Sequence, residues 1–70
     1  MLKIKSEVTG TVWKVLVNAG QSVQADEVLV IVESMKMEIP IAAERAGQVV
    51  EVFVTEGDSV AEDQVVIQLA

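Results

Sequence analysis

The chain has 70 residues, of which 51% are apolar, and this length predicts a single small domain. Five basic residues against eleven acidic ones give a net charge of −6, which argues against a nucleic-acid partner and against an anionic membrane surface. Cysteine and histidine are both absent, so disulfides, thiolate metal sites and the usual general base are excluded.

No run of the sequence approaches the roughly 20 apolar residues that a membrane-spanning helix needs. The first ten residues, "MLKIKSEVTG", also lack the apolar stretch of a secretory signal. We therefore expect a cytoplasmic location. Valine dominates the apolar residues, and because valine favours a pleated surface over a helix, we expect an all-β fold with no helix.

In chain order, Gly10 is expected to open a first strand, "TVWKVLV", whose valine spacing breaks strict alternation and predicts a bulge. The turn "NAGQ" follows, in which Gly20 is expected to take a positive φ. The polar segment "QADE" then leads into "VLVIV", a continuous apolar run that predicts a strand covered on both faces. Trp13 is expected to lie in the core, with a docking surface as the alternative.

The segment "KMEIPIA" predicts a further strand, with Met37, Ile39 and Ile41 on one face and Glu38 and Pro40 on the other. Proline cannot donate a ladder hydrogen bond, so this strand is expected to lie at a sheet edge or to leave that site unpaired.

The chain matches itself at an offset of 37 positions, so that residues 4–33 align without a gap with residues 41–70. Eleven of the thirty aligned positions are identical, namely Ile4/Ile41, Glu7/Glu44, Gly10/Gly47, Val12/Val49, Val15/Val52, Val17/Val54, Gly20/Gly57, Ser22/Ser59, Val23/Val60, Asp26/Asp63 and Val28/Val65. The second copy therefore repeats the elements of the first, with the turn "TEGD" around Gly57 and strands "QVVEVFV" and "VVIQL". Two copies are too few for a solenoid and instead predict a symmetric sandwich or flattened barrel.

The repeat leaves residues 34–40, "SMKMEIP", outside both copies. Lys36 is therefore expected at a hairpin tip between the halves, with the chain termini at the other end of the domain. The simplest interpretation of a single lysine is an exposed turn residue. Met35 and Met37 indicate a recognition site around the lysine, because methionine is overused at surfaces that another protein recognises. Strand alternation predicts that both methionines share a face opposite Lys36.

The motif "ESMKMEIPI" resembles the attachment motif of the biotinyl domain of biotin-dependent carboxylases. Together with the repeat and the turn "GDSV" at 57–60, the resemblance covers essentially the whole chain and is strongest to the short, free-standing bacterial biotin/lipoyl attachment proteins. It implies a flattened β-barrel or sandwich of two four-stranded sheets, the barrel-sandwich hybrid. Ser34 stands where many carboxylases have alanine, and "SEVTG" stands where many have a proline-rich segment.

The resemblance implies that a biotin ligase attaches biotin to Lys36, whose uncharged ε-amine attacks a biotinyl-adenylate. Met35 and Met37 would present the lysine to the ligase, and Glu33, Ser34 and Glu38 would flank the hairpin. The domain would then be a non-catalytic carrier, a monomer that carries carboxybiotin between the biotin carboxylase and carboxyltransferase components of a carboxylase.

Two other functions remain open at this point. A lipoyl domain has the same fold and a modified lysine at the same hairpin, but its tip typically shows Asp-Lys-Ala, and a dual biotin/lipoate acceptor is also possible. A purely structural barrel-sandwich module, as in adaptors of efflux systems, usually sits between long helical segments and lacks the Met-Lys-Met. No metal site is expected, since the acidic residues of the second half lack the spacing of a calcium loop.

Overall fold

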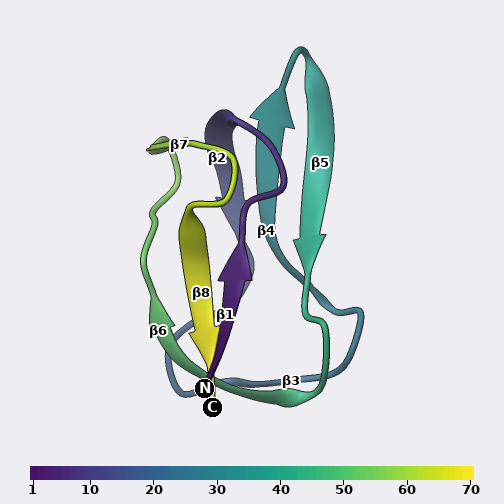
Figure 1. The fold of residues 1–70 in the computed structure, drawn as a ribbon, viewed down its shortest axis with the longest axis vertical. Coiled ribbons are helices and arrows are strands. Elements are labelled where there is room, and N and C mark those ends of the chain that lie inside the picture. Colours follow the sequence, from purple (N-terminus) through teal and green to yellow (C-terminus); the bar gives the residue numbers. More distant parts are fainter.

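The computed structural model describes residues 1–70, which form eight strands and no helix (Figure 1). The strands are β1 (Leu2–Lys5), β2 (Gly10–Val15), β3 (Ser22–Val23), β4 (Val28–Ser34), β5 (Met37–Ala42), β6 (Gly47–Val52), β7 (Ser59–Val60) and β8 (Val65–Leu69). They build two four-stranded sheets, in the orders β1-β8-β6-β3 and β5-β4-β2-β7. All strand pairs are antiparallel. The all-β prediction is confirmed, and each sheet keeps two edges, so the molecule is a sandwich and not a closed barrel.

The two sheets are copies of one another under the 37-residue offset. Adding 37 to the bounds of β2 and β3 gives the bounds of β6 and β7. Replacing each strand of the first sheet by its repeat partner turns the order β1-β8-β6-β3 into β5-β4-β2-β7, which is the order of the second sheet. The sequence repeat is therefore a repeat of structure, and each half contributes two strands to each sheet.

The core obeys the same symmetry. Every one of the 16 buried residues has a buried partner at the 37-residue offset. The pairs are Ile4/Ile41, Ser6/Ala43, Val12/Val49, Val17/Val54, Val23/Val60, Leu29/Val66, Val30/Ile67 and Val32/Leu69. Burying apolar side chains in matched pairs between two sheets is the main favourable term in the folding of such a small domain.

The turns repeat as well. Gly20 and Gly57 have φ of 92° and 97°, as the sequence predicted. Asp26 and Asp63 occupy the left-handed region too, with φ of 67° and 70°. Only a polar segment was predicted around each aspartate, although aspartate is among the residues that tolerate this conformation.

The predicted bulge in the first strand is present, and it explains why the expectation for Trp13 was wrong. The register of β2 against β4 shifts between Val12 and Lys14, so Trp13 is the extra residue. Its side chain is 44% exposed, with the Lys14 ammonium 5.5 Å from the ring centroid. Val50 is the matching extra residue of β6 and is also exposed. The bulge turns both side chains away from the core.

The expectation that "VLVIV" is covered on both faces was also wrong. Leu29, Val30 and Val32 are buried in β4, whereas Ile31 is only half-buried, because the sandwich covers one face of each sheet. The adjacent residues Leu29 and Val30 are both buried where the β4–β5 register shifts. Strand β5 lies at a sheet edge, as Pro40 predicted.

The molecule measures 30 × 19 × 18 Å. The β4–β5 tip lies at one end of the long axis and both termini lie at the other, as predicted (Figure 1). The structure contains no helix with the length and apolar character needed to cross a membrane.

Gly10 and Gly47 occupy equivalent positions but should respond differently to alanine. A Cβ on Gly10 would clash with the Glu33 carbonyl oxygen, and this neighbour is backbone within a sheet. A Cβ on Gly47 would meet its nearest neighbours, the Ala70 carbonyl oxygen and an Arg45 side-chain nitrogen, at 3.2 Å. We expect Gly10→Ala to lower the free energy of unfolding by about 2 kcal/mol or more, as overpacking does, and Gly47→Ala to change it by less than about 1 kcal/mol. Urea titrations of both variants measure this, and equal losses would contradict it.

Candidate functional site

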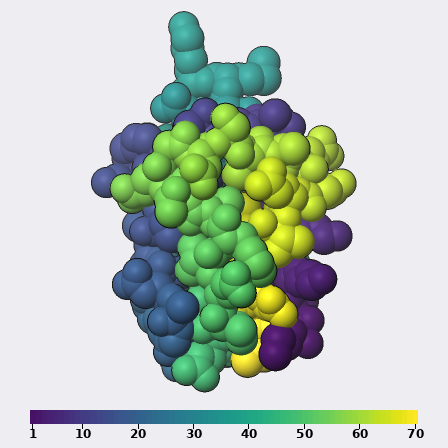
Figure 2. All heavy atoms as spheres, turned by 90° about the vertical axis from the view of Figure 1, so that its left-hand side faces the viewer, coloured from purple at the N-terminus to yellow at the C-terminus, as the bar shows by residue number.

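The β4–β5 hairpin is the element that places Lys36. Its strands pair from Val28 opposite Ala42 up to Ser34 opposite Met37, so only Met35 and Lys36 remain to form the turn. The hairpin rises above the rest of the sandwich (Figure 1), and in the space-filling view its teal tip stands clear of the other side chains (Figure 2). Because the hairpin is this long, its two-residue turn projects beyond the rest of the sandwich.

The turn has an unusual backbone conformation for its residues. Met35 and Lys36 have φ of 53° and 64°, and positive φ at both central residues is the mark of a type I′ turn. Such turns match the twist of a hairpin but strongly favour Asn-Gly or Asp-Gly. A side chain with a Cβ in the left-handed region costs roughly 1–2 kcal/mol per residue. The tip therefore carries two residues that local backbone energetics disfavour.

Both methionines are exposed. Met35 is 93% and Met37 63% exposed, so neither is a core residue. Strand alternation, from which a shared face was predicted, does not apply to both residues. Met35 belongs to the turn, where the alternation of a strand does not apply, and only Met37 lies within β5. Along β5 burial increases from Met37 through the half-buried Ile39 to the buried Ile41.

Two carboxylates flank the tip. Glu33 and Glu38 lie directly opposite each other on β4 and β5, one residue pair below Ser34 and Met37. Like charges opposite each other on neighbouring strands are destabilising. The only cation of the hairpin is Lys36, which stands exposed beyond them.

The upper end of the hairpin, just below the two-residue turn, is hydrogen-bonded to the β1–β2 turn. The Ser34 hydroxyl donates a hydrogen bond to the Thr9 carbonyl oxygen at 2.9 Å. The Thr9 hydroxyl oxygen in turn accepts a hydrogen bond from the Glu62 backbone N–H at 3.1 Å. Sequence reasoning identified Ser34 but missed Thr9 and Glu62, because these contacts join residues 25 and 53 positions apart and no local pattern marks them.

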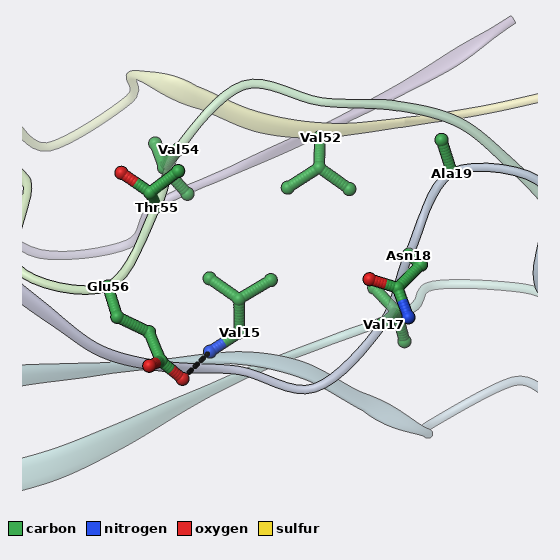
Figure 3. A pocket seen from close by; sticks show the side chains of 8 residues that line it. All are labelled: Val15, Val17, Asn18, Ala19, Val52, Val54, Thr55 and Glu56. Atoms are coloured by element: carbon green, nitrogen blue, oxygen red, sulfur yellow. Dashed lines mark hydrogen bonds between the residues drawn. The ribbon is translucent and has the colours of Figure 1, made fainter.

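The surface also has a hollow of about 470 Å³ that lies away from the hairpin. Its lining residues form four pairs at the 37-residue offset, Val15/Val52, Val17/Val54, Asn18/Thr55 and Ala19/Glu56. Val15 and Val52 point toward each other across it, and a Glu56 carboxylate oxygen accepts a hydrogen bond from the Val15 N–H at 3.3 Å (Figure 3). No hairpin residue lines this hollow, so it is separate from the site around Lys36.

Comparisons with known proteins agree with this geometry. A family model described as "Biotin-requiring enzyme" matches residues 3–69. The chain is 44% identical over 45 residues to the "Biotin/lipoyl attachment protein" of Bacillus subtilis (strain 168), a match that covers 64% of this chain and 62% of that protein. It is 42% identical over 40 residues to the "Biotinylated protein TB7.3" of Mycobacterium tuberculosis (strain ATCC 25618 / H37Rv), covering 57% and 56% of the two chains. The matched region thus spans less than two thirds of these relatives.

Two solved structures are similar over nearly the whole chain. The urea carboxylase of Kluyveromyces lactis matches with a TM-score of 0.93 at 30% identity, over 99% of this chain and 6% of that one. The lipoyl domain of the 2-oxoglutarate dehydrogenase complex of Azotobacter vinelandii matches with a TM-score of 0.77 at 27% identity, over 96% and 95% of the two chains.

The backbone of the tip yields a stability prediction. Met35→Asn replaces a residue that disfavours the left-handed region by one that tolerates it, at a position that is 93% exposed. We expect the free energy of unfolding in urea to rise by about 1 kcal/mol. Met37→Asn is the matched control, because Met37 lies in β5 and asparagine is disfavoured in strands, so no gain is expected there. A loss of stability in Met35→Asn would contradict the type I′ assignment.

Proposed function

Because the chain belongs to the biotin/lipoyl attachment family, we propose that it is a biotin carboxyl carrier that is modified at Lys36. The observation that carries this proposal is the position of Lys36 at the tip of the β4–β5 hairpin, in a turn whose residues are unfavourable for its backbone. A stable fold by itself favours Asn-Gly at this turn. Met35 and Lys36 are therefore explained by a requirement other than stability.

The exposed Lys36 side chain is suited to covalent attachment of biotin. Its ε-amine must lose a proton before it can act as a nucleophile. The uncharged nitrogen then forms an amide bond with the biotin carboxyl carbon, while the bond from that carbon to the adenylate breaks and AMP leaves. The chain supplies no histidine or cysteine to take the proton, so the base is assigned to the ligase. The amide is neutral, and the net charge of the chain changes from −6 to −7.

When bound, biotin supplies a ring nitrogen that accepts and donates a carboxyl group. The role of the chain is to hold the attached biotin at the tip of a folded domain. The β4–β5 hairpin projects Lys36 away from the core, so the lysine side chain can enter the active site of another protein without unfolding the domain. A tethered group meets two successive sites at a raised effective concentration. We therefore propose a biotin carboxylase and a carboxyltransferase as partners, with no catalysis by the chain itself.

We assign recognition by the biotin ligase to Met35 and Met37. Both side chains are exposed and lie next to Lys36, and methionine adapts its shape to a partner surface. Glu33, Ser34 and Glu38 form the flanks of the recognised hairpin. The unit that acts is proposed to be residues 1–70 as one monomeric domain, with halves 4–33 and 41–70 and the attachment hairpin 34–40.

Lipoate is the second candidate cargo. It is favoured by the similarity to the Azotobacter vinelandii lipoyl domain, which matches along almost its full length. The Met-Lys-Met tip favours biotin, because lipoyl domains typically carry Asp-Lys-Ala at this hairpin. We therefore place biotin first and include lipoate in the test below.

The first test is intact-mass analysis of the chain after incubation with a biotin ligase, biotin and ATP. We expect one biotinyl adduct, which is lost in Lys36→Arg and retained in Lys14→Arg, since Lys14 lies in β2 and outside the hairpin. A parallel incubation with lipoate and a lipoate ligase is expected to give no adduct. An adduct with lipoate alone would reverse the choice of cargo, and an adduct retained in Lys36→Arg would refute the site.

The second test concerns the methionines. The double variant Met35→Asp/Met37→Ala gives the tip the Asp-Lys-Ala of lipoyl domains, and both substituted side chains are exposed. We expect the initial rate of biotinylation to fall at least about tenfold, which corresponds to about 1.4 kcal/mol of lost recognition. The unfolding free energy should not fall, because aspartate tolerates a positive φ at residue 35.

Leu16→Ala serves as the matched control for this variant, because Leu16 is a 49% exposed apolar side chain outside the hairpin. Its biotinylation rate should equal that of the wild type. An unchanged rate in the double variant would remove the methionines from the recognition site.

A further inference from the structure

We propose that Ser34 is a positioning residue, whose hydroxyl fastens the attachment hairpin to the β1–β2 turn and so restrains the backbone that carries Lys36. The consequence for modification rests on the function proposed above. The restraint itself is a property of the free domain and can be tested without any modification.

The geometry provides the restraint in two steps. The Ser34 hydroxyl donates to the Thr9 carbonyl oxygen at 2.9 Å, which links the last residue of β4 to the β1–β2 turn. Thr9 is itself held from the second half of the chain, because its hydroxyl oxygen accepts from the Glu62 N–H at 3.1 Å. The hairpin is thus connected through Thr9 to the β7–β8 turn.

The Ser34 hydrogen bond lies directly next to the turn that carries Lys36. Ser34 and Met37 are the last paired residues, and above them only Met35 and Lys36 remain. Pairing below Ser34 brings Glu33 opposite Glu38, which weakens the hairpin at the level where it leaves the sandwich. A side-chain hydrogen bond at Ser34 acts one residue before the turn, where the ladder is about to end.

The internal repeat provides evidence that the sheets do not require these two hydrogen bonds. Thr9 corresponds to Ala46 at the 37-residue offset, so the hydroxyl that accepts from the Glu62 N–H has no equivalent in the second half. Ser34 lies outside both copies of the repeat, so its bond to the Thr9 carbonyl oxygen has no equivalent either. Ala46 has no hydroxyl, yet β6 follows it at Gly47 as β2 follows Thr9 at Gly10, and the two sheets have equivalent strand orders. The two hydrogen bonds that link Glu62 to Thr9 and Thr9 to Ser34 therefore occur only at the end of the molecule that carries Lys36.

The restraint has a direct consequence for the lysine. With the hairpin held at Ser34, the reach of the attached group comes from the torsions of the Lys36 side chain, while the turn stays in its left-handed conformation. A ligase then meets an ordered turn and does not have to order it on binding, which would otherwise weaken association.

The test compares Ser34→Ala, Ser34→Thr and Thr9→Val in the full chain, with Ser22→Ala as control because Ser22 is an exposed strand serine at the far end of the domain. The first readout is the heteronuclear ¹⁵N NOE of the backbone amides of residues 35–37. Ser34→Ala should lower it clearly at all three amides, and Thr9→Val should lower it less, because the Thr9 carbonyl is retained. Ser34→Thr, which keeps a hydroxyl, should restore wild-type values, and Ser22→Ala should not change them.

The second readout is the steady-state biotinylation of the same variants. Ser34→Ala should raise KM about fivefold, the effect of roughly one lost hydrogen bond, and leave kcat unchanged. A general loss of stability would not produce this split, nor would Ser34→Thr reverse it. An unchanged NOE profile in Ser34→Ala, or a Ser34→Thr variant that behaves like Ser34→Ala, overturns the inference. Failure of a biotin ligase to modify the wild-type chain would refute the proposed function, and the NOE comparison would still decide the role of Ser34.

Discussion

The fold depends on the interleaving of its two halves. Each sheet takes two strands from each copy of the repeat, so neither copy can bury its apolar face without the other. The buried side chains come in pairs at a constant offset, and each pair places one side chain from each half in the same core. A domain of 70 residues buries a modest share of its surface, and sharing one core between two copies uses its few apolar residues economically.

This constraint separates the residues that serve the fold from those that do not. The core pairs and the glycine turns repeat, because both copies must satisfy the same packing and the same backbone conformations. The segment 34–40 lies outside the repeat, and the local rules are broken there. Met35 and Lys36 occupy a turn that favours Asn-Gly, and Glu33 lies opposite Glu38. Departures from local preference concentrated at one site are expected where function constrains the sequence more than stability does.

The hairpin is divided in the same way into a paired part and an unpaired turn. Below Ser34 the strands belong to a sheet that pairs continuously from β5 to β7, and above it only two residues remain. The paired part of the hairpin thus extends almost to the lysine, and Lys36 itself is exposed. The hollow between residues 15–19 and 52–56 follows the symmetry of the repeat, and no residue of the hairpin lines it.

The sequence by itself determined the repeat, the all-β class, the positive φ of Gly20 and Gly57, the edge position of the strand with Pro40, and the placement of Lys36 at a hairpin tip. These features depend on spacing and on residue types whose backbone preferences act locally. Only the tertiary structure decided that a bulge turns Trp13 into solvent, that Met35 belongs to the turn, and that Ser34 is connected through Thr9 to Glu62. Each of these depends on strand register or on contacts between residues distant in the chain, and register is fixed when the two halves pack against each other.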